Sequence, residues 1–315
     1  MSPTVTHHGR RQAVIDTFTK NGLKAVAIIA SSFVLVIAGV ILTKGIGPFI
    51  TDNDGLGRVG VIPFLTGDTW LTGPYSQSSL YSVGFAIVST FFIAFLSLVL
   101  SFPIGVLTAL FIAKIAPKRL AGMLRTVIEM LASIPSIIYG LFGAGLILQL
   151  VYDFSAFIGY QSKGGNSVLA SVIVLALMTI PTITSISEVA IRSVSKDLEH
   201  ASLALGASPT QTHFKVVLSA AKSGIFTSAI LGIGRVLGEA TAVSLVSGGR
   251  RSGFSFDILD TTSTLTTLML EGHHETVGID YDIRFSVGLV LMGVILLTNL
   301  VLNAVKRRVG NLDVK

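Results

Sequence analysis

The chain has 315 residues, of which 51% are hydrophobic and only 13% are charged. Soluble domains carry about 25% charged residues, and the mean hydropathy here is +0.77. This balance argues against a soluble domain and indicates a polytopic membrane protein with an all-α fold. Because cysteine is absent, neither disulfides nor Cys-based metal sites are expected.

A helix needs about 20 apolar residues to cross a bilayer, and six stretches approach or exceed that length. In chain order they are 25–43, 83–113, 130–152, 167–187, 223–249 and 285–305. The second stretch is too long for one perpendicular span and too short for two, and it contains Pro103. We expect one tilted or kinked helix there, and therefore six spanning helices in all.

The basic residues are distributed unevenly between the segments that join these spans. With the N-terminus inside, 16 of the 23 Lys and Arg residues fall in cytoplasmic segments and 6 in outer segments, and Arg235 lies within a span. Lys and Arg favour the cytoplasmic side. The pattern predicts that both termini are cytoplasmic, and it explains the net charge of +6 without a nucleic-acid partner.

The spans divide the chain into four parts. We expect a cytoplasmic tail over 1–24, a first helix and outer loop over 25–79, a core of five helices over 80–308, and a cytoplasmic tail over 309–315. Within the core, 190–222 is the only long cytoplasmic connection. A contact with a cytosolic partner is therefore expected there.

The loop 190–222 reads as two short helices around a turn. Gly206 can end the first helix with a positive φ, and Ser208 and Pro209 can start the second as N-cap and first residue. One face of the first helix is apolar, at Leu198, Ala201 and Leu205. This pattern is also typical of a helix lying on the membrane surface, and the two interpretations remain open.

Two charges interrupt the fifth apolar stretch. Arg235 and Glu239 are four residues apart, so on a continuous helix they can touch. A charge at the centre of a span costs about 2.5–3.5 kcal/mol. The two residues therefore form either an ion pair that fixes packing, or a site in which Arg235 binds a passing anion and Glu239 holds it. Gly234 and Gly238 beside them would let a neighbouring helix approach closely.

Other motifs carry less chemistry. The "IPS" and "IPT" stretches at 134–136 and 180–182 can break helices and widen a cavity, or merely kink them. His273 and His274 lack an evident third metal ligand, and no P-loop pattern occurs. We therefore expect no catalytic residue, no metal site and no cofactor in this chain.

The loop 190–222 resembles the EAA loop of ABC importer permeases. His200-Ala201-Ser202 stands where that family has Glu-Ala-Ala, Gly206 where it has Gly, and Leu218-Ser219 where it has Leu-Pro. The resemblance implies that this loop couples the chain to an ATPase. The residues that it places in this coupling role are Glu199, His200, Ala201, Ser202, Gly206 and Leu218.

Three further stretches resemble the membrane subunits of the phosphate-specific ABC importer. They are "IPFLTGDTW" (62–70), "ASIPSIIYGLFG" (132–143) and "GRVLGEATAV" (234–243), and the first and last look more like the PstC type than the PstA type. The resemblance covers roughly residues 20–308. It implies a type I ABC importer permease fold with six transmembrane helices, in the inner membrane of a prokaryote.

The same resemblance implies a transport subunit that moves inorganic phosphate into the cytoplasm and is not itself an enzyme. It implies four partners besides the bilayer: a second permease subunit of the PstA type, two cytosolic ATPase subunits that bind the ATP, and an extracytoplasmic phosphate-binding protein. It also favours Arg235 and Glu239 as residues of the substrate pathway.

Two alternative functions remain open from the sequence. One is an ABC permease for another oxyanion or small polar solute. The other, of a different class, is an ATP-independent secondary carrier or channel, although no internal repeat of the kind found in such carriers is apparent.

Overall fold

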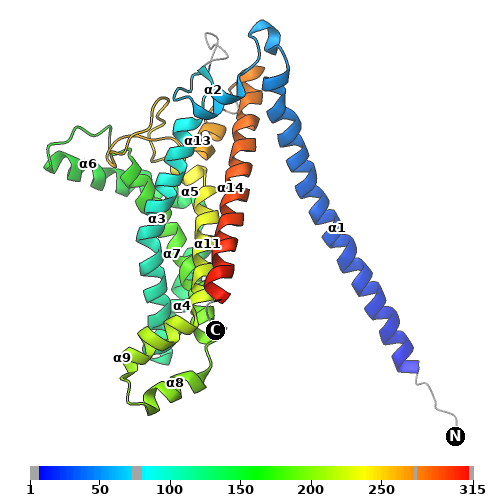
Figure 1. Cartoon of the computed structure of the whole chain (residues 1–315), viewed down its shortest axis with the longest axis vertical. Coiled ribbons are helices and arrows are strands. Elements are labelled where there is room, and N and C mark those ends of the chain that lie inside the picture. Colours follow the sequence, from blue (N-terminus) through cyan, green and yellow to red (C-terminus); the bar gives the residue numbers. More distant parts are fainter. Residues whose placement is uncertain (1–6, 73–79, 273–274, 312–315) are drawn as a thin grey trace.

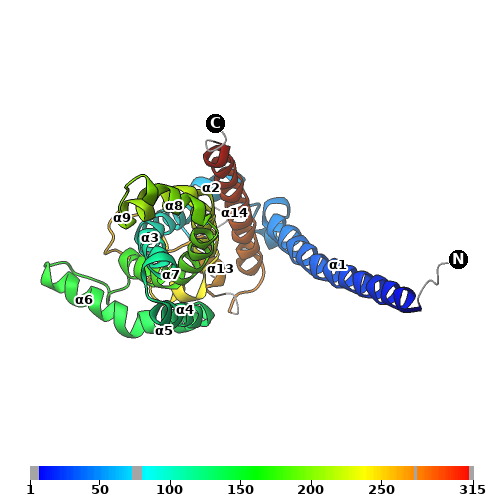
Figure 2. The same ribbon diagram turned by 90° about the horizontal axis from the view of Figure 1, so that it is seen from below.

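The computed structural model describes residues 7–72, 80–272 and 275–311. His273 and His274, and the outermost residues of both expected tails, lie outside the described residues. Figure 1 shows an elongated bundle of helices from which one long helix diverges, and Figure 2 shows the same bundle from one end.

Four helices form the centre of the bundle. They are α3 (Gly84–Leu110), α7 (Val168–Arg192), α11 (Lys222–Leu237) and α14 (Ile279–Asn311). Glycines bring three of them close together at Ile183 of α7. A Cβ atom on Gly105 of α3 would lie 2.7 Å from Cγ2 of Ile183, and one on Gly232 of α11 would lie 3.2 Å from its Cγ1. Such close backbone approach by small residues is typical of helices packed within a membrane.

The helix α1 (His7–Ile50) leaves the bundle and meets it only near one end (Figure 1). There Ser286 Oγ donates to the carbonyl of Gly45 over 2.7 Å, and Lys44 Nζ lies 3.3 Å from Oδ1 of Asp282. The sequence predicts a span over 25–43 after a tail, but the helix already begins at His7 and is 44 residues long. The polar residues before the span continue the helix because no proline occurs among residues 7–24.

One continuous helix is confirmed for the second apolar stretch. The α-helix α3 contains Pro103 and continues as a π-helical turn over Phe111–Ile115, so that the candidate span is Gly84–Ile115.

The third span begins later than the helix expected over 130–152, because the chain is interrupted at residues 134–135 and the candidate span is Ser136–Phe157. The chain forms α4 (Lys118–Ser133), α5 (Ser136–Phe142), a π-helical turn (Gly143–Ile147) and α6 (Leu148–Phe157). Pro135 causes the interruption, because it lacks an N–H group and forces Ile134 before it into an extended conformation with ψ 127°. Apolar length alone does not reveal such a break.

The connection after α7 has the predicted form. It consists of α8 (Lys196–Ala204), α9 (Pro209–Gln211), a π-helical turn (Thr212–Val217) and α10 (Leu218–Ala220). Gly206 has φ +86°, and Ser208 caps the second helix by accepting from the backbone N–H of Gln211. These short helices project from one end of the bundle (Figure 1).

The segments at the other end pack together. They contain η1 (Asn53–Gly55), α2 (Val61–Thr66), α12 (Thr241–Ser244) and α13 (Leu265–Leu270). The backbone N–H of Trp70 donates to the carbonyl of Arg251 over 2.7 Å. Phe64, Trp70 and Tyr81 are buried in one apolar cluster with Leu265 of α13. We call the packed segments at this end of the bundle the outer cap, and the "FLTGDTW" stretch belongs to it.

Among the described residues, five helices are long and apolar enough to span a membrane, and a sixth span arises if the bent pair Pro209–Ala220 and Lys222–Leu237 counts as one. This agrees with the predicted all-helical, polytopic fold. The first turns of α1 and the last turns of α14 lie at the same end of the molecule as α8 and α9 (Figure 1).

Candidate functional site

The two charged residues of the fifth stretch do not share a helix face, and this part of the sequence interpretation is wrong. The helix α11 ends at Leu237, so Glu239 lies beyond it. Its carboxylate Oε1 accepts hydrogen bonds from the backbone N–H of Ala242 over 3.0 Å and from Oγ1 of Thr241 over 2.8 Å. Glu239 therefore holds the turn that starts α12, in the way that an acidic residue caps a helix.

Arg235 has a different partner. Its Nη1 donates to Oγ1 of Thr182 on α7 over 2.9 Å, and among the described residues no ion pair joins Arg235 to Glu239. A guanidinium has five N–H donors. Within the described part of the chain Thr182 is its sole hydrogen-bond partner, so most of these donors remain available. The side chain is half-buried.

A group of hydroxyls surrounds the turn that Glu239 holds. Ser136 and Thr241 hydrogen-bond each other through their side-chain oxygens over 2.9 Å. Thr266 of α13 donates from Oγ1 to the carbonyl of Glu239 over 2.7 Å. The turn is thus tied to α5 on one side and to the outer cap on the other.

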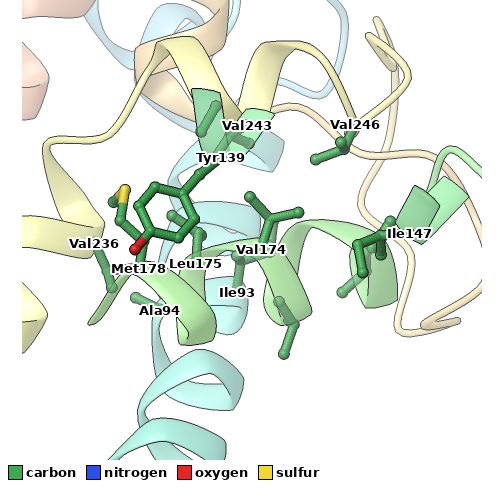
Figure 3. Packing of buried hydrophobic residues seen from close by; sticks show 14 of the residues in the cluster. Ile93, Ala94, Tyr139, Ile147, Val174, Leu175, Met178, Val236, Val243 and Val246 are labelled. Carbon is green, nitrogen blue, oxygen red and sulfur yellow. The ribbon is translucent and has the colours of Figure 1, made fainter. Parts of the chain in front are cut away.

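Tyr139 packs beside this turn. Figure 3 shows its ring among Met178 of α7, Val236 of α11 and Val243 of α12, in the largest apolar cluster of the bundle. Its hydroxyl donates to the carbonyl of Leu131 over 2.9 Å. A hollow of about 340 Å³ opens next to the ring; it is lined by Leu131, Ile134, Ile138, Tyr139, Phe142 and Leu177.

The two proline stretches position the partner hydroxyls. Ser136 directly follows Pro135, which ends α4, and Thr182 directly follows Pro181, which lies inside α7 without ending it. The sequence interpretation named both stretches as breaks or kinks but did not name Ser136, Thr182, Thr241 or Thr266. A hydroxyl residue directly after an intramembrane proline was the signal for the first two.

The close helix approach expected at Gly234 and Gly238 does not occur among the helices that the structure describes. A Cβ atom on Gly234 would meet nothing within 4 Å, and one on Gly238 would meet only carbonyls of its own helix. Gly232, two residues earlier, does pack against a neighbouring helix, as does Gly224.

The residues expected in the coupling loop lie together at the projecting end. Glu199 pairs with Lys114, which lies at the end of α3, and Ser202 hydrogen-bonds Thr212 through the two side-chain oxygens over 2.9 Å. His200, Ala201 and Gly206 are exposed, whereas Leu218 is half-buried. The tip is apolar and open, since Leu205 is 89% exposed. The pair Glu199–Lys114 therefore ties the loop to the bundle, the Ser202–Thr212 bond holds its two halves together, and its apolar tip points outward.

A second polar cluster lies in the outer cap, away from Arg235. Tyr160 donates from its hydroxyl to Oδ2 of Asp257 over 2.7 Å, and this hydrogen bond raises the pKa of Tyr160 to about 12. Burial alone would raise the pKa of Asp260, but the hydrogen bonds from Thr261 and Arg250 hold that pKa below its ordinary value. These contacts hold the 250–262 segment together and tie it to Tyr160, and the backbone N–H of Val168 at the start of α7 donates to the carbonyl of Asp260 over 3.0 Å.

Comparison with known proteins places this architecture in a family. The model of the binding-protein-dependent transport system inner membrane component matches residues 101–311. The chain is 36% identical over 272 residues to the probable ABC transporter permease protein YqgH of Bacillus subtilis, covering 84% of each chain. It is 29% identical over 283 residues to the phosphate transport system permease protein PstC 1 of Mycobacterium tuberculosis, covering 80% of this chain and 84% of that one.

The fold also matches a solved structure. A chain of the bacterial alginate ABC transporter, in complex with an alginate-bound periplasmic protein, superposes with a TM-score of 0.65 at 17% identity, covering 95% of this chain and 97% of that one. The multi-pass helical fold, the projecting loop and the family match together identify the chain as an inner-membrane permease component of the binding-protein-dependent ABC importers, a non-catalytic subunit that works with ATPase subunits and a binding protein.

Proposed function

We propose that this chain is the PstC-type permease subunit of an importer that moves inorganic phosphate into the cytoplasm. The observation that carries the proposal is Arg235, which lies in the bent span with most of its N–H donors unused by the described residues. An uncompensated charge at membrane depth costs about 2.5–3.5 kcal/mol. A guanidinium that binds a phosphate oxyanion through two parallel hydrogen bonds recovers much of that cost.

The surrounding hydroxyls support this assignment. Thr182 orients the guanidinium by accepting its hydrogen bond. Thr241 donates its hydroxyl to Glu239, and Ser136 hydrogen-bonds Thr241, so these two hydroxyls hold the neighbouring turn while Arg235 supplies the donors for an oxyanion. Since Glu239 accepts hydrogen bonds in its own turn, its negative charge lies close in sequence without neutralising Arg235 directly. A carboxylate so placed keeps the site from holding an anion too tightly, which a transport pathway requires.

Relatives support phosphate as the solute. Besides the mycobacterial protein, the phosphate transport system permease protein PstC of Pasteurella multocida is 30% identical over 257 residues. We infer the matching partners: a second permease subunit of the PstA type, two cytosolic ATPase subunits and an extracytoplasmic phosphate-binding protein. In this arrangement the apolar tip of the α8–α9 loop contacts an ATPase subunit, and both termini are cytoplasmic.

The test is transport by the complete complex in liposomes. We expect ATP-dependent uptake of radiolabelled phosphate only when the binding protein is present outside, and no uptake of sulfate under the same conditions. Uptake of sulfate or another solute without phosphate uptake would contradict the proposed substrate and leave the family assignment intact.

A further inference from the structure

A basic hollow lies at the end of the bundle from which α8 and α9 project. It has a volume of about 370 Å³ and lies between the end of α3, the start of α4 and the end of α7. Its lining combines small or apolar residues with cations: Ile112, Ala113, Ala116, Lys118, Ala121, Gly122, Arg125 and Arg192. The small side chains leave room for a ligand, and the cations favour a ligand with a negative charge.

The charge of this hollow is only partly neutralised. Glu188, which is buried beneath it on α7, accepts hydrogen bonds from both Arg125 and Arg192. Arg192 also donates from Nη2 to the carbonyl of Ile112 over 3.2 Å. Lys118 forms no hydrogen bond or ion pair with any residue that the structure describes. Glu188 and, at longer range, Glu129 thus offset part of the charge of the two arginines, whereas Lys118 has no partner among the described residues.

The start of α4 adds to this positive potential. The first intrahelical bond runs from the N–H of Ala121 to the carbonyl of Pro117, and no side chain caps the N-terminus. The N–H groups of the first turn therefore lack helical partners, and the helix dipole favours an anion there. This helix has 16 residues, and the residues Ala116 and Lys118 at its start line the hollow.

Apolar side chains beside the hollow favour a lipid as the source of that anion. Ile115 is 51% exposed and Met123 is 59% exposed, on the two segments that border the hollow. A cation-lined depression flanked by exposed apolar residues, at the end of the spanning helices, matches a lipid headgroup with its acyl chains alongside.

We propose that this hollow binds the phosphate group of an anionic phospholipid of the cytoplasmic leaflet, with Lys118 as the unpaired cation that contacts it. The inference rests on the proposed function only for its orientation, which places this end of the bundle in the cytoplasm. Bound lipid would hold α4 against α3 and α7 at the base of the pathway. Inorganic phosphate offers the same chemistry from the aqueous phase, so the test must separate the two sources.

The test is native mass spectrometry of the purified full chain titrated with phosphatidylglycerol, and with phosphatidylethanolamine of the same acyl chains. We expect preferential retention of phosphatidylglycerol and about tenfold weaker binding in Lys118→Ala, the loss that one charge-assisted contact causes. Arg119→Ala is the matched control, because Arg119 is adjacent and exposed but does not line the hollow.

A second variant fills the space and leaves the ion pairs in place. A Cβ atom on Gly122 would meet nothing within 4 Å, so the fold tolerates Gly122→Leu, and the added side chain would stand at the hollow that Gly122 lines. Gly22→Leu on α1, where a Cβ also meets nothing, is its control. We expect only Gly122→Leu to weaken phosphatidylglycerol binding.

Three results would overturn the inference. They are equal retention of the two lipids, equal losses in Lys118→Ala and Arg119→Ala, and binding of radiolabelled inorganic phosphate that depends on Lys118 while phosphatidylglycerol binding does not. Lipid binding by the purified chain is independent of the transported solute. Its failure is therefore distinguishable from a failure of the phosphate assignment.

Discussion

The guanidinium of Arg235 on α11 donates to the hydroxyl of Thr182 on α7 over 2.9 Å, while Glu239 lies past the end of α11 and holds a separate turn. The two charges therefore have separate tasks. Arg235 is carried by α11 and hydrogen-bonds a neutral hydroxyl, whereas Glu239 stabilises the turn that follows the helix.

The first prediction concerns Arg235. We expect Arg235→Gln to lower phosphate uptake tenfold to hundredfold, because a lost charge-assisted contact costs about 1.5–3 kcal/mol. Arg235→Lys keeps the charge without the planar fork and should be partly active at best. Uptake is measured in membranes with equal protein levels, and Arg58→Gln in the exposed outer loop is the control.

The same assay tests the separation of the two charges. The double variant Arg235→Glu with Glu239→Arg should stay inactive, because the residues do not pair and Glu239 is needed in its own turn. Restored uptake in that double variant would contradict the hypothesis that Arg235 contacts the transported anion.

The second prediction concerns the turn of the coupling loop. Gly206 has φ +86° and a Cβ there would meet nothing within 4 Å, so only backbone conformation restricts the position. We expect Gly206→Val to uncouple ATP hydrolysis from uptake, whereas Gly206→Asn, which tolerates a positive φ, should retain most coupling. The ratio of ATP hydrolysed to phosphate transported measures this, and equal ratios in the two variants would count against it.

The third prediction compares two glycines of α11. Gly232→Leu should destabilise the isolated chain by about 1–3 kcal/mol, because its side chain would collide with Thr179 and Ile183. Gly234→Leu should change stability by less than about 0.5 kcal/mol, since its Cβ meets open space. Thermal unfolding in detergent measures both. If Gly234 contacts a second subunit, Gly234→Leu should instead impair assembly with that subunit.

The fourth prediction concerns pH. The pKa of Tyr160 is raised to about 12 by its hydrogen bond to Asp257, so this bond stabilises the outer cap below pH 10 and is lost as the pH rises through about 12. Asp257→Asn should bring the titration of Tyr160 down toward its ordinary value of 10.0. Ultraviolet difference spectra against Tyr160→Phe measure the shift, and an unchanged titration in Asp257→Asn would contradict it.

The fifth prediction concerns orientation. Single cysteines can be introduced cleanly because the chain has none. Val277→Cys in the outer cap should label with an impermeant thiol reagent added outside intact cells, since Val277 is 87% exposed. Leu205→Cys at the tip of the coupling loop should label only after the membrane is opened. The reverse pattern would invert the proposed topology.

Local signals in the sequence predicted a large part of this structure. The apolar stretches predicted the spans because burial in lipid depends mainly on composition and length. Gly206, Ser208 and Pro209 predicted the turn between α8 and α9 because a left-handed turn and a helix cap are set by adjacent residues.

Features that depend on where a helix ends could not be read in the same way. The end of α11 is set by the outer cap, where Thr266 reaches the carbonyl of Glu239 from 27 residues away. Likewise, Thr182 became the partner of Arg235 because α7 and α11 pack at Gly232, a contact between segments distant in the chain. The sequence placed both charges correctly in the fifth stretch but could not supply their partners.

The attachment of α1 at one end has a mechanical consequence. A helix of 44 residues is about 66 Å long, roughly twice the hydrocarbon thickness. Its contacts with α14 lie near Lys44 and Gly45, close to one end. Such a helix is held near one end only, so a rotation at the held end displaces the far end. If the outer end of α14 tilts by about 10°, well within the spread of tilts in membranes, the far end of α1 sweeps roughly 11 Å. A small movement at the attached end of α1 would therefore become a larger movement at the opposite end of the molecule, where α8 and α9 lie.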